Sequence, residues 1–233
     1  MKLNTGTIVL TGFALVLAAG WPAQAQSTKA TFPDMAPLDQ YLMERAAEVA
    51  LARSAAPDSI SRDAEVWVLG RQGYETAVNG KNGFVCMVAR SWTSPIDDPD
   101  FWNPRLRAPI CFNPAAVRST VRQTIRKTKV ILATRSKDQM IKDIKAAIDK
   151  KELLPPEPGA MCYMMSKDGY LNSRDGHWHP HLMFFVPLTD PATWGADLPG
   201  VPLFGVRDDL DHVTVFLIPV AKWSDGTAAV DVY

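Results

Sequence analysis

The chain lacks the short motifs that identify many enzyme reactions. It contains no G-x-S-x-G elbow, no S-x-x-K motif and no phosphate-binding glycine loop, and it has no internal repeat or low-complexity tract. These absences argue against serine hydrolases of those two kinds, P-loop nucleotide-binding proteins and repeat proteins. The information lies instead in a few scarce residue types, the 4 histidines and 3 cysteines among 233 residues.

Net charge is also lacking. The sequence has 25 basic and 25 acidic residues, and its formal net charge is zero. A protein that binds nucleic acid usually carries a basic excess on at least one face, so we expect no nucleic-acid partner. The expected partners are a small molecule, a metal ion or another protein.

Only the N-terminus is apolar over a long stretch. Lys2 precedes an apolar run at 8–19, and Ala23-Gln24-Ala25 follows with the small-x-small form of a cleavage site. This order predicts a secretory signal peptide over 1–25, because the run is short for a membrane span. We expect the remaining chain, 26–233, to be a single soluble domain without a membrane span, located in the periplasm or secreted.

Three cysteines allow one disulfide and leave one thiol over. Three pairings are open in an oxidising compartment. We favour Cys86 with Cys111, because these two flank a loop rich in proline and tryptophan that a covalent link would stabilise. The alternative is that Cys86, Cys111 and Cys162 are all reduced and buried as small apolar residues.

The hydrophobic pattern predicts an α+β fold. Apolar residues recur at three- and four-residue spacing over 37–53, in a helix that begins at Pro114, and in a helix that Ser136 would cap. Strand composition recurs at 64–70, 74–80, 83–90, 160–166, 181–188, 201–206 and 212–220. We therefore expect helices from the first and middle thirds and a mainly antiparallel sheet, with an ordered loop at 91–113.

Three of the four histidines lie within five residues of one another. In the segment HWHPH, Pro180 disfavours helix and marks the irregular start of a strand. In extended backbone His177, His179 and His181 would share one face, and Trp178 would lie on the other. Imidazoles two residues apart can bind one transition metal ion, so these three residues are candidate metal ligands for zinc or copper.

A second strand would have to complete such a metal site. His212 is the remaining histidine, and Asp209 and Asp211 lie beside it. We expect His212 or Asp211 to supply the further ligand if the two strands pair. The alternative is that the histidines are structural, because histidine often hydrogen-bonds inside a fold.

Two segments resemble a group of uncharacterised exported bacterial proteins. These segments are NGFVCMV at 82–88 and HPHLMFF at 179–185, and the likeness extends over 57–187. The group shares an Asn-Gly-aromatic-x-Cys segment and a later Pro-His-x-Met segment, and it implies no activity. His181 matches its pattern, whereas His177 and His179 lie outside it.

These features leave three hypotheses for the function. The first is an exported protein that binds a divalent transition metal through HWHPH. The second is a non-enzymatic envelope or interaction domain that recognises a small ligand or a protein through aromatic residues such as Trp178. The third is a metal-assisted hydrolase that uses the same histidines. The sequence identifies no catalytic residue and leaves open whether the protein is an enzyme.

Overall fold

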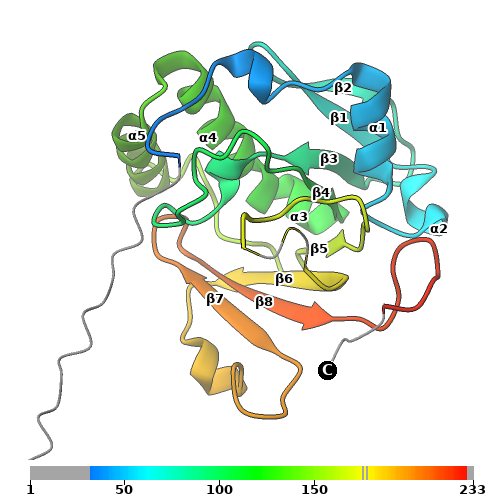
Figure 1. Ribbon diagram of the computed structural model, residues 1–233. Coiled ribbons are helices and arrows are strands. Elements are labelled where there is room, and N and C mark those ends of the chain that lie inside the picture. Colours follow the sequence, from blue (N-terminus) through cyan, green and yellow to red (C-terminus); the bar gives the residue numbers. More distant parts are fainter. Residues whose placement is uncertain (1–31, 175, 177, 230–233) are drawn as a thin grey trace, which may run out of the picture.

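A computed structural model describes residues 32–174, 176 and 178–229. The expected signal peptide and His177 lie outside the described residues. The described part forms one eight-stranded sheet with helices on both faces (Figure 1). It confirms the predicted α+β class, with helices from the first and middle thirds of the chain and a mostly antiparallel sheet.

The strand order in the sheet is β2-β1-β3-β4-β5-β6-β8-β7, and every neighbouring pair is antiparallel except β1 and β3. The strands of the first third, β1 and β2, and those of the last third, β5 to β8, are therefore joined through β3 and β4. The strands are β1 (Glu65–Gly70), β2 (Gly73–Val78), β3 (Val85–Ala89), β4 (Ala108–Phe112), β5 (Met161–Met164), β6 (His181–Pro187), β7 (Phe204–Asp208) and β8 (Val213–Pro219).

The helices cover the two faces of the first half of the sheet. The α-helices are α1 (Arg45–Arg53), α2 (Asp58–Ser61), α3 (Pro114–Arg118), α4 (Thr120–Thr134) and α5 (Lys137–Asp149), with 3-10 turns η1 (Leu38–Gln40), η2 (Ser91–Thr93) and η3 (Pro191–Trp194). Alternate residues of β3 face opposite sides: Cys86 packs with Ala52 of α1, and Met87 packs with Val121 of α4. Figure 1 shows α1 and α4 on opposite sides of the sheet.

Two predicted helices differ from the structure, and the stretch over 91–113, expected to be a loop, contains β4. The helix expected over 37–53 begins only at Arg45, because the Glu44 side chain accepts the amides of Ala46 and Ala47 and caps α1 there. The helix from Pro114 is interrupted at Ser119, whose φ of −117° and ψ of −85° separate α3 from α4. The predicted cap of α5 is confirmed, since Ser136 Oγ accepts the amide of Gln139.

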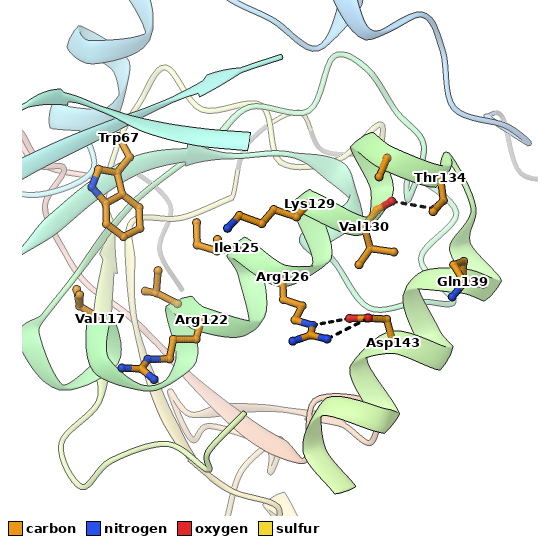
Figure 2. Close-up of a pocket in the computed structure, with 12 residues that line it drawn as sticks. Trp67, Val117, Arg122, Ile125, Arg126, Lys129, Val130, Thr134, Gln139 and Asp143 are labelled. Atoms are coloured by element: carbon orange, nitrogen blue, oxygen red, sulfur yellow. Dashed lines mark hydrogen bonds and ion pairs between the residues drawn. The ribbon is translucent and has the colours of Figure 1, made fainter. Parts of the chain in front are cut away.

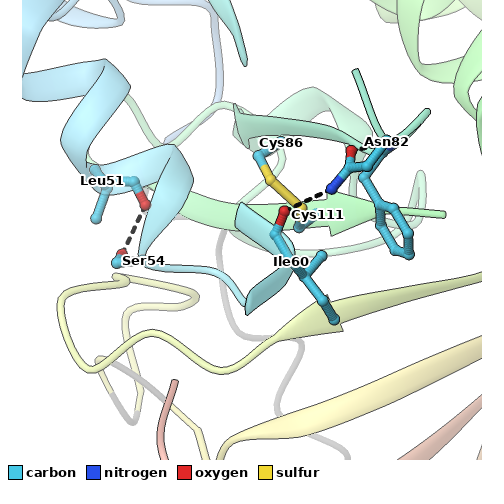
Figure 3. The surroundings of a disulfide bond; sticks show 7 residues. Leu51, Ser54, Ile60, Asn82, Cys86 and Cys111 are labelled. Carbon is cyan, nitrogen blue, oxygen red and sulfur yellow. Dashed lines mark hydrogen bonds between the residues drawn. A yellow bond between two sulfur atoms is a disulfide. The ribbon is translucent and has the colours of Figure 1, made fainter. Parts of the chain in front are cut away.

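The favoured disulfide is present. Cys86 of β3 and Cys111 of β4 are directly opposite each other in the sheet and are bonded through their sulfur atoms, as Figure 3 shows beside α1 and α2. Cys162 is a buried free thiol on β5, and burial raises its pKa well above the ordinary value. The bridge thus joins two central strands, and the remaining cysteine is an inert packing residue.

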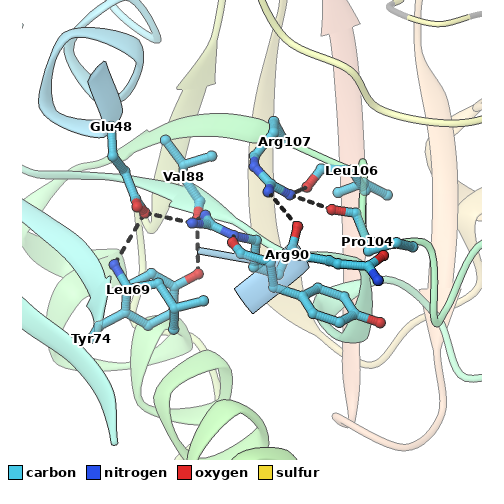
Figure 4. Close-up of polar contacts among 10 residues, drawn as sticks. Glu48, Leu69, Tyr74, Val88, Arg90, Pro104, Leu106 and Arg107 are labelled. Atoms are coloured by element: carbon cyan, nitrogen blue, oxygen red, sulfur yellow. Dashed lines mark hydrogen bonds and ion pairs between the residues drawn. The ribbon is translucent and has the colours of Figure 1, made fainter. Parts of the chain in front are cut away.

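A buried ion pair holds α1 against the sheet. Glu48 of α1 and Arg90, which follows β3, are 1% and 0% exposed, and Arg90 Nη2 lies 2.8 Å from Glu48 Oε1. The same carboxylate oxygen accepts the amide of Leu69 of β1, and Arg90 Nε donates to the carbonyl of Tyr41 (Figure 4). Two charges therefore fix the positions of three separate segments.

In the part of the chain that the structure describes, no helix is long and apolar enough to cross a membrane.

Candidate functional site

The second half of the sheet is open where the helices end, and a cavity of about 700 Å³ lies on its surface. We call this the main cavity. Its floor is the sheet face that α4 also covers, and its walls are α4, the loop over 93–98, the segment over 171–174 and Trp178. A cavity of this size with an apolar floor and a few polar groups is typical of a small-molecule site.

Strand alternation produces the apolar floor. His181, Met183 and Phe185 of β6 point to the same face and all border the main cavity, which confirms the predicted face of that strand. Their partners on the neighbouring strands continue the floor, because directly paired residues share a face. Those partners are Met164 of β5, Val213, Val215 and Leu217 of β8, and Phe204 and Val206 of β7.

Local hydrogen bonds fix both loops that wall the cavity. Asp100 accepts the hydroxyl and the amide of Ser173, each at 2.6 Å, and Tyr170 forms a two-way backbone bridge with Arg107. On the other loop the buried Trp92 donates its indole N–H to Thr128 of α4 at 3.0 Å. The walls are thus held by contacts that do not use the cavity floor.

His181 is a buried, neutral imidazole on the cavity wall. It is 2% exposed, and burial lowers its pKa to about 4. Its Nδ1 lies 2.7 Å from the carbonyl oxygen of His179. Because a carbonyl can only accept, Nδ1 carries the proton in the neutral ring and Nε2 carries the lone pair.

The Trp178 and His181 rings lie next to each other, not on opposite faces of a strand as predicted. Its ring centroid is 4.8 Å from that of His181 and 5.5 Å from that of Phe204, and it borders the same cavity. The predicted alternation of Trp178 and His181 is therefore wrong, because β6 begins only at His181 and residues 178–180 are not in a strand. The result is an aromatic edge at this end of the cavity.

The opposite end of the main cavity is polar, and we call it the α4 end. Lys127 Nζ of α4 lies 2.6 Å from Oδ2 of Asp211, in the turn between β7 and β8, and 3.9 Å from Oδ2 of Asp208, the last residue of β7. Gln123 Nε2 donates to the Asp211 carbonyl at 2.8 Å. Burial raises the pKa of the Asp211 carboxyl, and the ammonium of Lys127 acts against that shift.

His212 does not lie near His181. It precedes Val213, which pairs with Pro187, whereas His181 pairs with Pro219 at the other end of β6. Six residues of strand at about 3.4 Å each put His212 and Asp211 on the order of 20 Å from His181. The strands pair as expected, but their register keeps His212 and Asp211 away from the histidine segment.

No three His, Cys, Asp or Glu side chains within 32–174, 176 and 178–229 are grouped closely enough to hold a metal ion. His177 lies outside these residues. Of the candidate ligands, the structure places His179 and His181 near each other through the backbone contact above. Metal binding at HWHPH therefore stays a prediction.

A second, shallower groove of about 610 Å³ lies between α4 and α5 and is bordered by Trp67 (Figure 2). It contains Arg122 and Arg126 of α4, which follow Arg118 of α3 at four-residue spacing. Arg126 is bonded to Asp143 and Glu152, and outside the groove Arg118 is bonded to Glu157. These ion pairs are consistent with a solvated face that lacks excess charge.

No protein-family model, curated protein or solved structure matches the chain. The resemblance at 82–88 and 179–185 accordingly stays an expectation. The function has to be argued from the cavity itself.

Sequence patterns did not indicate most residues of the cavity. Thr120, Gln123 and Thr124 look like ordinary helix positions, and only their three- and four-residue spacing, which Lys127 continues, places them on one face of α4. A polar stripe of this kind on a helix that packs against a sheet is the one signal that would have pointed to a buried polar group. For Asp211, the sequence suggests only the role of a metal ligand.

Proposed function

We propose that this protein is an exported binding protein that holds a small, largely apolar molecule in the main cavity. The observation that carries the proposal is the continuous apolar floor of β4, β5, β6, β7 and β8 under a cavity of about 700 Å³. Most of the polar residues that border it come from its walls, an arrangement that can orient a ligand while the floor keeps its apolar contact.

A fluorescent titration tests the binding. The apolar dye N-phenyl-1-naphthylamine gains fluorescence when it leaves water, so saturable enhancement reports occupation of an apolar cavity. Ala108→Phe adds a ring to the cavity floor on β4. If the new ring displaces the dye from only about 55 Å² of apolar surface, dye binding should weaken about tenfold.

The control substitution is Ala133→Phe. Ala133 borders the groove between α4 and α5, not the main cavity. It should leave dye affinity unchanged. If Ala133→Phe weakens dye binding and Ala108→Phe does not, the dye binds in the groove between α4 and α5 and not in the main cavity. The absence of saturable binding to the wild type would contradict the proposal.

Export is the second part of the proposal. The predicted signal peptide and the Cys86–Cys111 bridge support it, because disulfides persist mainly outside the cytoplasm. Expression of the full chain in a bacterium with a secretory pathway should give a periplasmic or secreted product that begins at Gln26. Mass spectrometry of the fractionated cells checks this, and a cytoplasmic, uncleaved product would contradict it.

Metal binding is a second candidate function, and one observation favours it. The Nδ1–H of His181 donates to a backbone carbonyl, the arrangement that commonly orients a histidine whose other nitrogen binds metal. Calorimetric titration with zinc, copper and nickel tests it. Replacing His177, His179 and His181 together with alanine should abolish stoichiometric binding, and unchanged binding would exclude these ligands. A metal-assisted hydrolase would depend on the same result.

A further inference from the structure

We propose that the α4 end of the main cavity binds the protonated amino group of an amphipathic amine, whose apolar body lies along the sheet floor. This inference rests on the proposed function and adds the chemistry of the ligand's head group. It starts from two buried oxygen atoms that lack a donor.

Thr120 Oγ1 and Asp211 Oδ1 are buried and have no hydrogen-bond partner among the described residues. Thr120 is only 9% exposed, and both residues border the main cavity. Buried oxygens without a donor are uncommon in folded proteins and are often explained by an absent ligand, ion or water. The Asp211 carboxylate oxygen can only accept, so it requires a hydrogen-bond donor, and the Thr120 hydroxyl can accept from a donor as well.

The donors already present at the α4 end are used elsewhere. The Lys127 ammonium contacts Asp211 Oδ2, and Gln123 Nε2 donates to the Asp211 carbonyl. Asp208 Oδ1 accepts two backbone amides, those of Leu210 and Asp211. The remaining capacity of this end is therefore mainly for accepting hydrogen bonds.

The charges at this end favour a cation. Two carboxylates, Asp208 and Asp211, face one ammonium, that of Lys127, which is 1% exposed. A ligand ammonium would balance the second carboxylate, because an uncompensated charge is unfavourable in a buried setting. A ligand carboxylate would add a third negative charge and leave Asp211 Oδ1 without a donor.

The rest of the cavity fits an alkyl body. Val213, Val215 and Leu217 lead away from Asp211 along β8, and the β6 partners of Val215 and Leu217 are Phe185 and Met183. This floor is on the order of 15–20 Å long at about 3.4 Å per residue, the length of an extended chain of about ten to fourteen carbons. An amine at the α4 end thus places its chain toward His181 and Trp178.

Three probes with the same chain test the head group: decylamine, decan-1-ol and decanoate. Calorimetric titration of the wild-type protein at pH 7 should give the order of affinity amine, alcohol, carboxylate. Removing one acceptor of a charged donor with Thr120→Val should weaken decylamine binding about tenfold. Asp211→Asn should weaken decylamine binding by more and reduce the preference for amine over alcohol.

Two controls separate the possible failures. Thr134→Val removes a hydroxyl near the C-terminal end of α4, outside the main cavity, and should leave all three affinities unchanged. Thr120→Val removes no existing hydrogen bond, so it remains a valid test even if Asp211→Asn fails to fold. Equal affinities for the three probes, or tightest binding of decanoate, would overturn the head-group assignment and leave the proposed function standing. Failure of all three probes and of the dye to bind would contradict the proposed function itself.

Discussion

At the scale of single residues, His181 shows how the fold sets the chemistry of a side chain. The sequence predicts that His181 begins a strand and shares a face with Met183 and Phe185, and the structure confirms this. The burial that makes the ring neutral was not predictable, because it comes from Trp178 and from strands and loops distant in the sequence. The local sequence pattern predicts to which face of a strand a side chain points, whereas tertiary packing determines its protonation state.

Acid should destabilise the protein through His181. Its pKa is about 4 in the fold and 6.5 as the ordinary value, so protonation favours the unfolded chain. The stability that the neutral ring provides is complete above pH 6.5 and is lost as the pH falls towards 4. From pH 7 to pH 5 the free energy of unfolding should fall by about 2 kcal/mol through this group alone.

Urea unfolding of the wild type and of His181→Gln at both pH values measures this contribution. The variant should lack that part of the pH dependence, whereas His212→Asn should retain it, because His212 is exposed. An equal pH dependence in all three proteins would show that His181 is not buried as a neutral ring.

At the scale of elements, the sequence predicts most of the fold and misses the middle of the sheet. β4 lies in a stretch that we expected to be an ordered loop, because Pro109 and the prolines before it argue against a strand. Its pairing with β3 on one side and β5 on the other overrides that local signal. Loss of periodicity near proline therefore indicates irregular backbone but does not exclude a short buried strand.

The disulfide should stabilise the sheet by constraining the unfolded chain. Cys86 and Cys111 are 25 residues apart, and a loop of that length corresponds to about 3 kcal/mol in the chain-entropy model. We expect the double variant Cys86→Ala/Cys111→Ala to lose about that amount in urea unfolding. Cys162→Ala, which keeps the bridge, controls for the loss of a buried sulfur, and a similar loss in both variants would argue against the bridge as the cause.

The ion pair between Glu48 of α1 and Arg90 should contribute far more to the free energy of unfolding than an exposed pair does. Glu48→Gln leaves the buried Arg90 guanidinium without a countercharge, and we expect a loss of about 3–5 kcal/mol. Glu75→Gln removes the partner of Arg45 from an exposed pair of similar distance and should cost less than about 1 kcal/mol. Thermal or urea unfolding of both variants measures the difference, and equal losses would contradict the role of burial.

At the scale of the whole molecule, the cavity could not be predicted because no segment contains it. Its floor comes from five strands between β4 and β8, and its walls come from α4 and from two loops on either side of it in the sequence. Trp178 and His181 border it at one end, and Asp211, which forms an ion pair with Lys127, borders it at the other. The sequence points to His181 at one end and Asp211 at the other, but it predicts that both bind one metal ion. The error arises because strand register cannot be read from the sequence.

A ligand in this cavity contacts elements from across the chain, so its binding should stabilise the entire fold. At a free concentration 100 times the dissociation constant, a ligand that binds only the folded protein raises the free energy of unfolding by about 2.7 kcal/mol. We expect this shift for decylamine with the wild type and a smaller one with Ala108→Phe at the same concentration, because a ring occupies part of the floor. Urea unfolding with and without decylamine, below the concentration at which it forms micelles, gives both values. An equal shift in the two proteins would mean that the amine binds elsewhere on the surface and not over the sheet.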